Sequence, residues 1–468
     1  MSKEYLNISV FVKKNGICSG CGACAGVCPQ KTLEMKFNRY GEYIPVDLHG
    51  KCSANCRLCL QICPFSSRAD NEDTLSQRLF SAVPNIQHRP ETGYYLTSYV
   101  GYTGIGDHRL NGASGGLATW TIETLLKQGR IDYAVCVTPN PDQHKLFKYI
   151  VCKTPEQIRA SAKSCYYPVE MSEIIQHILC CDGRYAIVGL PCFIKALRLV
   201  MQKSTILRKR IKYLLGLVCG QQKSTFFSEY ISALGGGDPR KLVSVHFREK
   251  DEHRPASDYG LRFACETDRG QIKEGTVFWT EGMDHVWCSR YFTLNACNFC
   301  DDIFAELADV AFMDAWLPEF KGDWRGTSIV LIRNPNIREL IKNGLNVTEL
   351  VLESLGIDHV IQSQAGGVFN KRTLLGKRLT WAARNKRPVI PKRVQPMHLG
   401  LSDTLSLNLE DIAMRQSKTH FLNLRDLRDF CSEEFSQKMQ RAAWYYKLIY
   451  KIIRKLNRIK QRIVRFKQ

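Results

Sequence analysis

Two clusters of cysteine near the N-terminus constrain this 468-residue chain more than any other feature. In CSGCGACAGVCP, residues 18–29, three cysteines follow one another at intervals of three, and a fourth comes directly before Pro29. This C-x2-C-x2-C-x3-C-P spacing is typical of iron–sulfur ligation, whereas zinc needs only cysteines in pairs. The glycines and alanines between the cysteines let the backbone curl closely around a cluster and direct its N–H groups at sulfur.

A second run of the same kind follows at residues 52–64, with one extra residue in its first gap and again a proline after the last cysteine. In ferredoxins with two clusters, the fourth cysteine of each run serves the other cluster. We therefore predict one [4Fe–4S] cluster on Cys18, Cys21, Cys24 and Cys63, and a second on Cys52, Cys56, Cys59 and Cys28. The alternatives are a pair of zinc knuckles or a disulfide-stapled module.

The composition excludes several classes of protein. At 44% hydrophobic residues the chain can bury the cores of two or three domains and is not disordered. Twenty cysteines would suit a disulfide scaffold only in a much shorter secreted chain, and the first residues show no apolar signal-peptide segment. No apolar run approaches the roughly 20 residues that span a bilayer. We expect reduced thiols and a cytoplasmic location, with any membrane contact peripheral.

The formal charge of +21 is concentrated in the last 33 residues, 436–468, which contain eleven Lys or Arg and no acid. Apolar residues recur there every three or four positions, which predicts a basic amphipathic helix. Such a helix suits the inner surface of an anionic membrane, with Trp444, Tyr445 and Tyr446 as interfacial anchors. Docking on protein is the alternative; nucleic acid is disfavoured because no nucleic-acid module accompanies the charge.

The expected fold class is α+β: a ferredoxin-like domain, a mixed-sheet α/β domain and a C-terminal amphipathic helix. The boundaries are 1–68 for the two-cluster domain, 69–93 for a linker, 94–396 for the large domain, 397–435 for a linker or helical segment, and 436–468 for the tail. A hairpin is expected between the cysteine runs, with its turn near residues 38–41. In the large domain, strands are predicted at YAVCV, YAIVGL, YLLGLVCG, LVSVHF, ADVAFMDAW and SIVLIRN.

Further cysteines of the large domain lie where strands end. Cys192 and Cys219 each follow an apolar strand-like run, and Cys297 and Cys300 form a CNFC motif before acidic residues. Strand ends converge on sites in open sheets, so these four are candidates for a third cluster, although Cys192 and Cys219 could instead be small buried hydrophobes. The remaining cysteines show no ligand spacing and are interpreted as structural: Cys136, Cys152, Cys165, Cys180, Cys181, Cys265, Cys288 and Cys431.

Six motifs of this chain carry a family resemblance. They are the doubled cysteine run, the NGASGG turn, SAKSCYYP from Ser161, GLPC from Gly189, VCG from Val218 and the segment CNFCDDIFAELADVAFMDAW. Together they resemble the beta subunit of coenzyme F420-reducing hydrogenase and dehydrogenase. This family includes ferredoxin-dependent chlorophyllide reductases, and the resemblance covers about residues 15–380. It implies FAD beside [4Fe–4S] clusters, with electrons passing between the clusters and a two-electron substrate. It also implies flavin contacts at Ser114, Gly115, Gly116, Lys163 and Ser164, although the Lys-Ser-Cys-Tyr order departs from the family's Ser-Lys-Tyr-like element.

The expected function is therefore an iron–sulfur flavoprotein oxidoreductase, linked to F420 or reducing an organic double bond or carbonyl. A membrane-associated reductase of polysaccharide or lipid-linked glycan biosynthesis, and an electron-transfer subunit without its own substrate, are the alternatives. Expected partners are ferredoxin or another redox protein, a small-molecule substrate and a second copy of the chain. No catalytic residue is assigned; His246, His253, His285 and Lys163 are candidate proton donors. A basic segment could attract an acidic partner or be merely solvated: Arg372, Lys377, Arg378, Arg384, Lys386, Arg387, Lys392 and Arg393.

Overall fold

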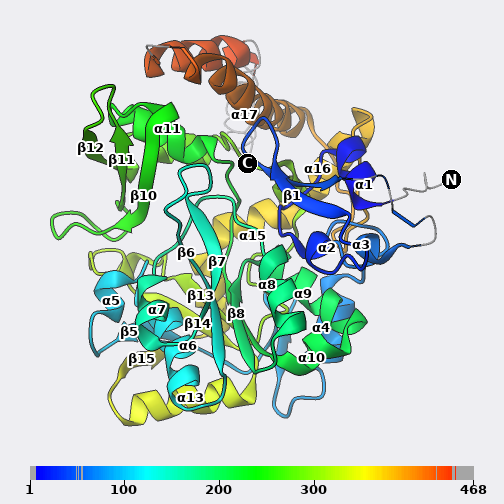
Figure 1. Ribbon diagram of the computed structural model, residues 1–468, viewed down its shortest axis with the longest axis vertical. Helices are drawn as coiled ribbons and strands as arrows, with labels where there is room; N and C mark the ends of the chain where they lie inside the picture. Colours follow the sequence, from blue (N-terminus) through cyan, green and yellow to red (C-terminus); the bar gives the residue numbers. More distant parts are fainter. Residues whose placement is uncertain are drawn as a thin grey trace, which may run out of the picture.

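A mixed sheet of eight strands forms the centre of the computed structural model (Figure 1), which describes residues 7–48, 50, 52–53, 56–427, 430–444 and 448–449. Four neighbouring strands run parallel in the middle, and antiparallel strands flank them on both sides. Their order is β15 (Leu350–Ser354), β5 (Thr97–Thr103), β14 (Ser328–Ile332), β13 (Val310–Asp314), β9 (Ile211–Leu217), β8 (Tyr185–Gly189), β6 (Tyr133–Pro139) and β7 (Phe147–Cys152). The large mixed sheet confirms the α+β class.

Both faces of this sheet are buried, which explains the nearly continuous apolar runs of its central strands. In β14, Ile329 and Leu331 belong to one core, whereas Val330 and Ile332 belong to the other. Helices α6 (Leu117–Lys127), α7 (Pro155–Ala160) and α13 (Pro335–Asn346) contribute apolar residues to the second core, and α8 (Ser172–Cys180), α9 (Pro191–Lys203) and α10 (Thr205–Arg210) contribute to the first. Five of the six predicted strands lie in this sheet: β6, β8, β9, β13 and β14.

The sixth predicted strand, LVSVHF, forms β10 (Leu242–Glu249) in a separate antiparallel sheet with β11 (Gly260–Glu266) and β12 (Ile272–Phe278). Helix α11 (Phe226–Leu234) packs against this sheet, and Phe263 of β11 is buried beneath it. The main and small sheets lie side by side (Figure 1), so loops from both face the same region.

The N-terminal cysteine runs fold as a small module on the edge of the large domain. It comprises α1 (Ile8–Asn15), α2 (Ala23–Gly26), the expected hairpin β1 (Leu33–Phe37) and β2 (Tyr43–Asp47), and α3 (Leu58–Gln61). Helix α2 lies against α8: a Cβ on Gly26 would stand 2.8 Å from Ile175 Cβ and 3.0 Å from Ser172 O. The module is therefore in direct contact with the large domain.

Residues 69–93, expected as a linker, contain helix α4 (Glu72–Phe80) and the hairpin of β3 (Gln87–Arg89) and β4 (Gly93–Tyr95). Asn71 caps the helix by accepting a hydrogen bond from the Thr74 N–H, and Glu72 is buried because its carboxylate binds Lys195 Nζ of α9 at 3.1 Å. The buried ion pair, invisible in the sequence, makes a polar segment part of the fold.

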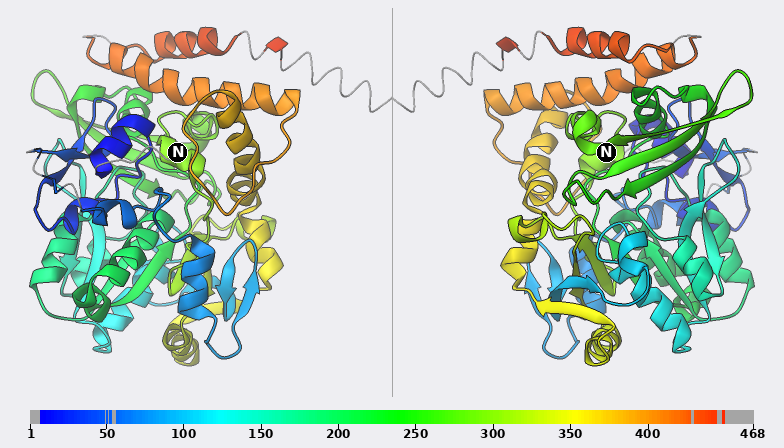
Figure 2. Two further views of the ribbon diagram at one scale, coloured as in Figure 1. Left: turned by 90° about the vertical axis from the view of Figure 1, so that its right-hand side faces the viewer. Right: turned by 90° about the vertical axis from the view of Figure 1, so that its left-hand side faces the viewer.

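Between the small sheet and β13 come η2 (Trp279–Glu281), α12 (Met283–Cys288) and η3 (Asn295–Phe299). After β15 come α14 (Ile357–Ser363), α15 (Ala365–Lys371), α16 (Thr373–Arg384) and the long α17 (Leu401–Arg425). Figure 2 shows α17 lying across one end of the molecule, above the N-terminal module and near the small sheet. Its Lys418 binds Glu42 of the module at 2.5 Å, and its Arg425 binds Glu229 of α11 at 2.8 Å. Helix α17 of segment 397–435 therefore connects the N-terminal module with helix α11 of the large domain.

The predicted basic tail lies mostly outside the described residues. Residues 432–444 are helical, and Trp444 at their end is 64% exposed. No helix in the described part of the chain has the length and apolar character needed to cross a membrane.

Candidate iron–sulfur sites and an adjoining charged cavity

The first cysteine run is shaped by glycines in left-handed backbone conformation. Gly20 has φ 70° and donates its N–H to Cys18 Sγ at 3.3 Å, as expected where backbone amides face a ligating sulfur. Gly22 has φ 77°, and a Cβ there would stand 2.2 Å from Glu170 Oε2. Larger residues are excluded at these positions, so the spacing glycines are required by the fold as well as by the sulfur contacts.

The thiols of the first predicted set lie near one another, and Cys59 of the second set lies near Cys24 and Cys63. Burial raises the pKa of the Cys24 thiol, and Cys21, Cys18 and Cys63 raise it further because they lie nearby. Burial likewise raises the pKa of Cys63 to about 12, with Cys21 and Cys59 adding to the effect. The four thiols of the first predicted set are thus close neighbours, although they come from both runs.

In the second predicted set, Cys59 is buried, and burial raises the pKa of its thiol. Cys52 and Cys56 lie close by and raise this pKa further. Cys28 Sγ lies 3.6 Å from Thr32 Oγ1. Cys28, Cys52 and Cys56 are half-buried, whereas Cys21 and Cys24 are buried. The second set therefore lies nearer the molecular surface than the first.

The four cysteines proposed for a third cluster also come together. Cys192 opens α9, Cys219 follows β9, and Cys297 and Cys300 lie in and after η3. Burial raises the pKa of Cys192, and Cys300, Cys219 and Cys297 each contribute because they are close. The structure thus unites cysteines that lie as far as 108 positions apart in sequence.

N–H groups face three of these four sulfurs. The backbone N–H of Gln222 donates to Cys297 Sγ at 3.2 Å, and its side-chain amide donates to Cys192 Sγ at 3.2 Å. Lys371 Nζ lies 3.0 Å from Cys300 Sγ. N–H donors directed at cysteine sulfurs are the surroundings that a [4Fe–4S] cluster requires.

Within the described residues, no three His, Cys, Asp or Glu side chains meet closely enough to hold a single metal ion. A [4Fe–4S] cluster places each thiolate on a different iron and so spaces its ligands more widely than one ion does. The donor set around Cys192 fits that wider group.

The first and third cysteine sets adjoin each other. Cys21 is close enough to Cys192 to raise the pKa of its thiol. The buried Tyr149 is near Cys192, Cys165 and Cys21, all of which raise the pKa of its phenol in addition to burial, and its hydroxyl donates to Val188 O at 3.2 Å. A continuous buried region therefore runs from the N-terminal module past the third set to Cys165.

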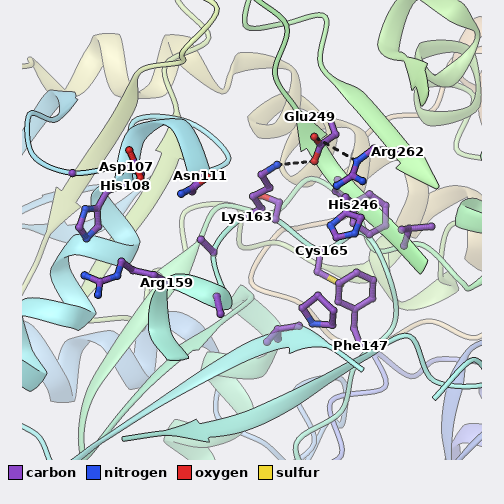
Figure 3. A pocket seen from close by; sticks show the side chains of 18 residues that line it. Asp107, His108, Asn111, Phe147, Arg159, Lys163, Cys165, His246, Glu249 and Arg262 are labelled. Atoms are coloured by element: carbon purple, nitrogen blue, oxygen red, sulfur yellow. Dashed lines mark hydrogen bonds and ion pairs between the residues drawn. The ribbon is translucent and has the colours of Figure 1, made fainter. Parts of the chain in front are cut away.

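Cys165 lines a cavity of about 670 Å³ between the main sheet and the small sheet. Its walls come from the segment around α5 (His108–Asn111), from β6 and β7, from the end of α7 and the residues after it up to Cys165, and from β10 and β11. Figure 3 shows His246, Arg262, Glu249 and Lys163 together on one side, Phe147 and Cys165 beneath them, and His108 and Arg159 on the opposite side. The volume lies in the range of small-molecule and cofactor sites.

Three cationic side chains, Arg159, Lys163 and Arg262, and two carboxylates, Asp107 and Glu249, line this cavity. Lys163 Nζ binds Glu249 Oε1 at 2.7 Å, and Arg262 Nε lies 3.9 Å from the other oxygen of the same carboxylate. Burial lowers the pKa of the neighbouring His246, and Arg262 lowers it further. Lys163, which lines the cavity, has φ 80°, an uncommon conformation for a residue with a side chain. One carboxylate shared by two cations leaves an environment suited to an anionic ligand.

Among the predicted flavin contacts, Lys163 and Ser164 line this cavity, whereas Ser114, Gly115 and Gly116 do not. Ser114 Oγ donates to Thr327 O at 2.7 Å, the Gly115 N–H donates to Ser328 Oγ at 2.8 Å, and a Cβ on Gly115 would stand 2.5 Å from Gly101 O. The Ser-Gly-Gly turn therefore joins β5 to the segment entering β14, and flavin contact at these three residues stays a prediction.

Sequence reasoning missed Glu249, Arg262, Phe147 and Asn111 as cavity residues, because they belong to separate elements and no motif joins them. Of the candidate proton donors, His246 and Lys163 line the cavity, whereas the side chain of His253 is 85% exposed and His285 faces Tyr291.

The basic segment expected as a docking patch is largely neutralised. Arg372 and Arg393 bind Glu306, Lys392 binds Asp301, Lys377 binds Asp403, and Arg378 binds Glu410. Lys377 and Arg378 thus hold α17, and the other three cations bind the acidic segment 301–306, so the idea of a free basic patch is wrong for these five.

Doubled cysteine runs and a cavity reached through further buried cysteines define an iron–sulfur protein of the oxidoreductase class. Family models for the N-terminal and C-terminal parts of the coenzyme F420 hydrogenase/dehydrogenase beta subunit match residues 98–176 and 182–356, and a 4Fe-4S dicluster domain matches residues 17–67. The two beta-subunit models together span more than half of the chain. The chain belongs to the family of coenzyme F420 hydrogenase/dehydrogenase beta subunits and carries a 4Fe–4S dicluster domain.

Two relatives are similar to this chain. The coenzyme F420-dependent sulfite reductase of Methanocaldococcus jannaschii is 23% identical over 360 residues, which is 72% of this chain but 48% of that protein, so the chain spans about half of its length. A subunit of the F(420)H(2) dehydrogenase of Methanosarcina mazei is 22% identical over 316 residues, covering 66% of this chain and 78% of the relative. A chain in the F420-reducing [NiFe] hydrogenase complex from Methanosarcina barkeri is 17% identical with a TM-score of 0.47, covering 63% of this chain and 96% of that one.

Proposed function

We propose that this protein moves electrons between ferredoxin-type [4Fe–4S] clusters and a two-electron substrate through a flavin, reducing F420 or an organic double bond or carbonyl, or running in reverse. The observation that carries the proposal is the continuous buried region from Cys21 past Cys192 and Tyr149 to Cys165 at the cavity. Clusters supply single electrons, and a flavin exchanges either one or two, so the pair would join the two kinds of chemistry.

In this proposal the protein's own residues bind and orient the two-electron partner. Lys163, Arg262 and His246 face the cavity from one side and favour an anionic ligand, while Phe147 and Phe247 supply an apolar wall. His246 is the candidate proton donor or acceptor, because it is half-buried in the cavity and its lowered pKa keeps it neutral near pH 7. Cys165 marks the side of the cavity that faces the cysteine sets.

The decisive experiment is anaerobic. The purified protein is assayed for iron, sulfide and flavin, and flavin reduction is followed after adding reduced F420 or dithionite. About twelve irons with one flavin support the proposal. About eight irons without flavin would leave a two-cluster carrier on a domain of another kind.

A matched pair of variants separates the sites. Cys192→Ser is expected to remove about four irons and to slow electron transfer between the N-terminal clusters and the flavin. Cys180→Ser, an exposed cysteine outside all three sets, should change neither. Equal iron content in both variants would contradict the third cluster.

An electron-transfer subunit without its own substrate is the simplest competing function. It would show clusters, and reduction by a redox partner, but no turnover of F420 or of any small molecule until a catalytic subunit is added.

A membrane-associated reductase is a second candidate, because the basic amphipathic tail contains the exposed Trp444. Flotation with vesicles of anionic phospholipid compares the full chain with a chain ending at residue 435. Flotation that depends on residues 436–468 supports it, and equal behaviour of both chains excludes it.

A further inference from the structure

Lys371 lies where a buried positive charge can act on the third cysteine set. It is the last residue of α15 and only 4% exposed, yet its ammonium group is 3.0 Å from Cys300 Sγ and 2.8 Å from Asp302 O. It is also within electrostatic reach of Cys219 and Cys297. A buried cation requires compensation by negative charge or hydrogen-bond acceptors, and a thiolate supplies both.

Of the acidic side chains around this position, Asp301 and Glu306 are matched by cations, whereas the Asp302 carboxylate forms no ion pair within the described residues. Asp301 binds Lys392 at 3.3 Å, and Glu306 binds Arg372 at 2.8 Å. Asp302 accepts the Glu306 N–H through one oxygen, while its other oxygen has no hydrogen-bond partner. Arg290 also acts on Cys297, but no hydrogen bond joins the two. In the described part of the chain, Lys371 is the charged donor that touches a sulfur of this set.

We infer that Lys371 is a positioning residue that sets the reduction potential of the cluster held by Cys192, Cys219, Cys297 and Cys300. The inference rests on the proposed third cluster. When such a cluster accepts one electron from a donor, its net charge becomes more negative by one. A fixed cation in a buried, weakly screened site stabilises the reduced form more than the oxidised form, so it raises the midpoint potential.

Lys371 lies beyond the segment that the family's C-terminal model matches. The match to the family's C-terminal model ends at residue 356, and α15 begins at Ala365. The two Gln222 donors come instead from inside the matched segment and carry no charge. Lys371 therefore adds a charge to a cluster environment whose neutral donors lie elsewhere.

Three substitutions separate charge from hydrogen bonding. Lys371→Gln keeps an N–H donor without the charge, Lys371→Met keeps length and volume without either, and Lys371→Arg keeps the charge. Lys377→Met, in the next helix and paired with Asp403, is the matched control. Each anaerobically purified holoprotein is titrated with dithionite in the presence of redox mediators, and cluster signals are followed by electron paramagnetic resonance.

The expected result is a lower midpoint potential of the third cluster in Lys371→Gln and Lys371→Met, with Lys371→Arg near wild type. The N-terminal clusters serve as internal references and should keep their potentials in all variants. Four irons fewer in Lys371→Met would show loss of the cluster, and Lys371→Gln then decides the outcome.

The failures are distinguishable. Full iron content with an unchanged third potential in Lys371→Gln overturns the role of Lys371 and leaves the proposed function intact. A wild-type protein with only two clusters overturns both.

Discussion

At the scale of single residues, Lys163 and Glu249 set the charge of the cavity. Because they form a 2.7 Å ion pair, a substitution of Lys163 removes positive charge from the cavity, whereas a substitution of Glu249 removes negative charge. Lys163→Gln removes a cation and should weaken binding of an anionic ligand such as F420 by about tenfold, roughly one charge-assisted hydrogen bond. Glu249→Gln frees the same cation and should tighten binding. Fluorescence titration with F420 measures both, with the exposed Lys212→Gln as control. Equal affinities in all variants would show that the ligand binds elsewhere.

His246 gives the cavity a pH dependence whose sign follows from its surroundings. Burial, and then Arg262, lower its pKa, so the folded protein resists the proton that the unfolded chain accepts near pH 6.5. The contribution of neutral His246 to the free energy of unfolding is therefore fully present above that pH, and it is lost as the pH drops below it. Urea midpoints between pH 5 and 8 should fall more steeply for wild type than for His246→Gln. Parallel curves would mean that His246 does not contribute.

At the scale of elements, the contact of α2 with α8 fixes the first cysteine run to the large domain. Gly26→Ala would place a Cβ 2.8 Å from Ile175 Cβ and 3.0 Å from Ser172 O, so the helices must separate. We expect a loss of about 1–3 kcal/mol in stability, together with a lower iron content. Thermal unfolding and iron analysis check this. Gly322→Ala, where a Cβ meets nothing within 4 Å, should behave like wild type; equal effects of both would refute the contact.

The sequence predicted strands more readily than it predicted their partners. Buried central strands such as β8 and β14 are continuous apolar runs, and the hairpin of β1 and β2 follows from alternation around a turn. The sequence of helix α4 predicts a linker, because its polar residues form no apolar stripe. Glu72 of this helix is buried because its carboxylate binds Lys195. β10 looked like the other strands, yet its pairing with β11 places it in a separate sheet.

At the scale of the whole molecule, the local spacing of cysteines predicted the cluster ligands but did not predict the cavity. Each cysteine run carries its ligands within a dozen residues, so the spacing alone indicates the chemistry. The cavity joins Lys163, His246 and Arg262 from three separate segments, and it exists only because the small sheet lies beside the main one. Lys371 reaches Cys300 across 71 positions, a contact that no local pattern could indicate.

The different depths of the cysteine sets predict the order in which the protein loses iron. Cys28, Cys52 and Cys56 are half-buried, whereas Cys21 and Cys24 are buried. Brief treatment with ferricyanide and EDTA should therefore first remove about four irons from the outer set. Iodoacetamide labelling followed by peptide mass spectrometry should then find Cys28 modified together with Cys52, Cys56 and Cys59, while Cys63 stays protected with Cys18, Cys21 and Cys24. Cys28 labelled together with the first run, or Cys63 with the second, would mean that each run holds its own cluster and that the crosswise assignment is wrong.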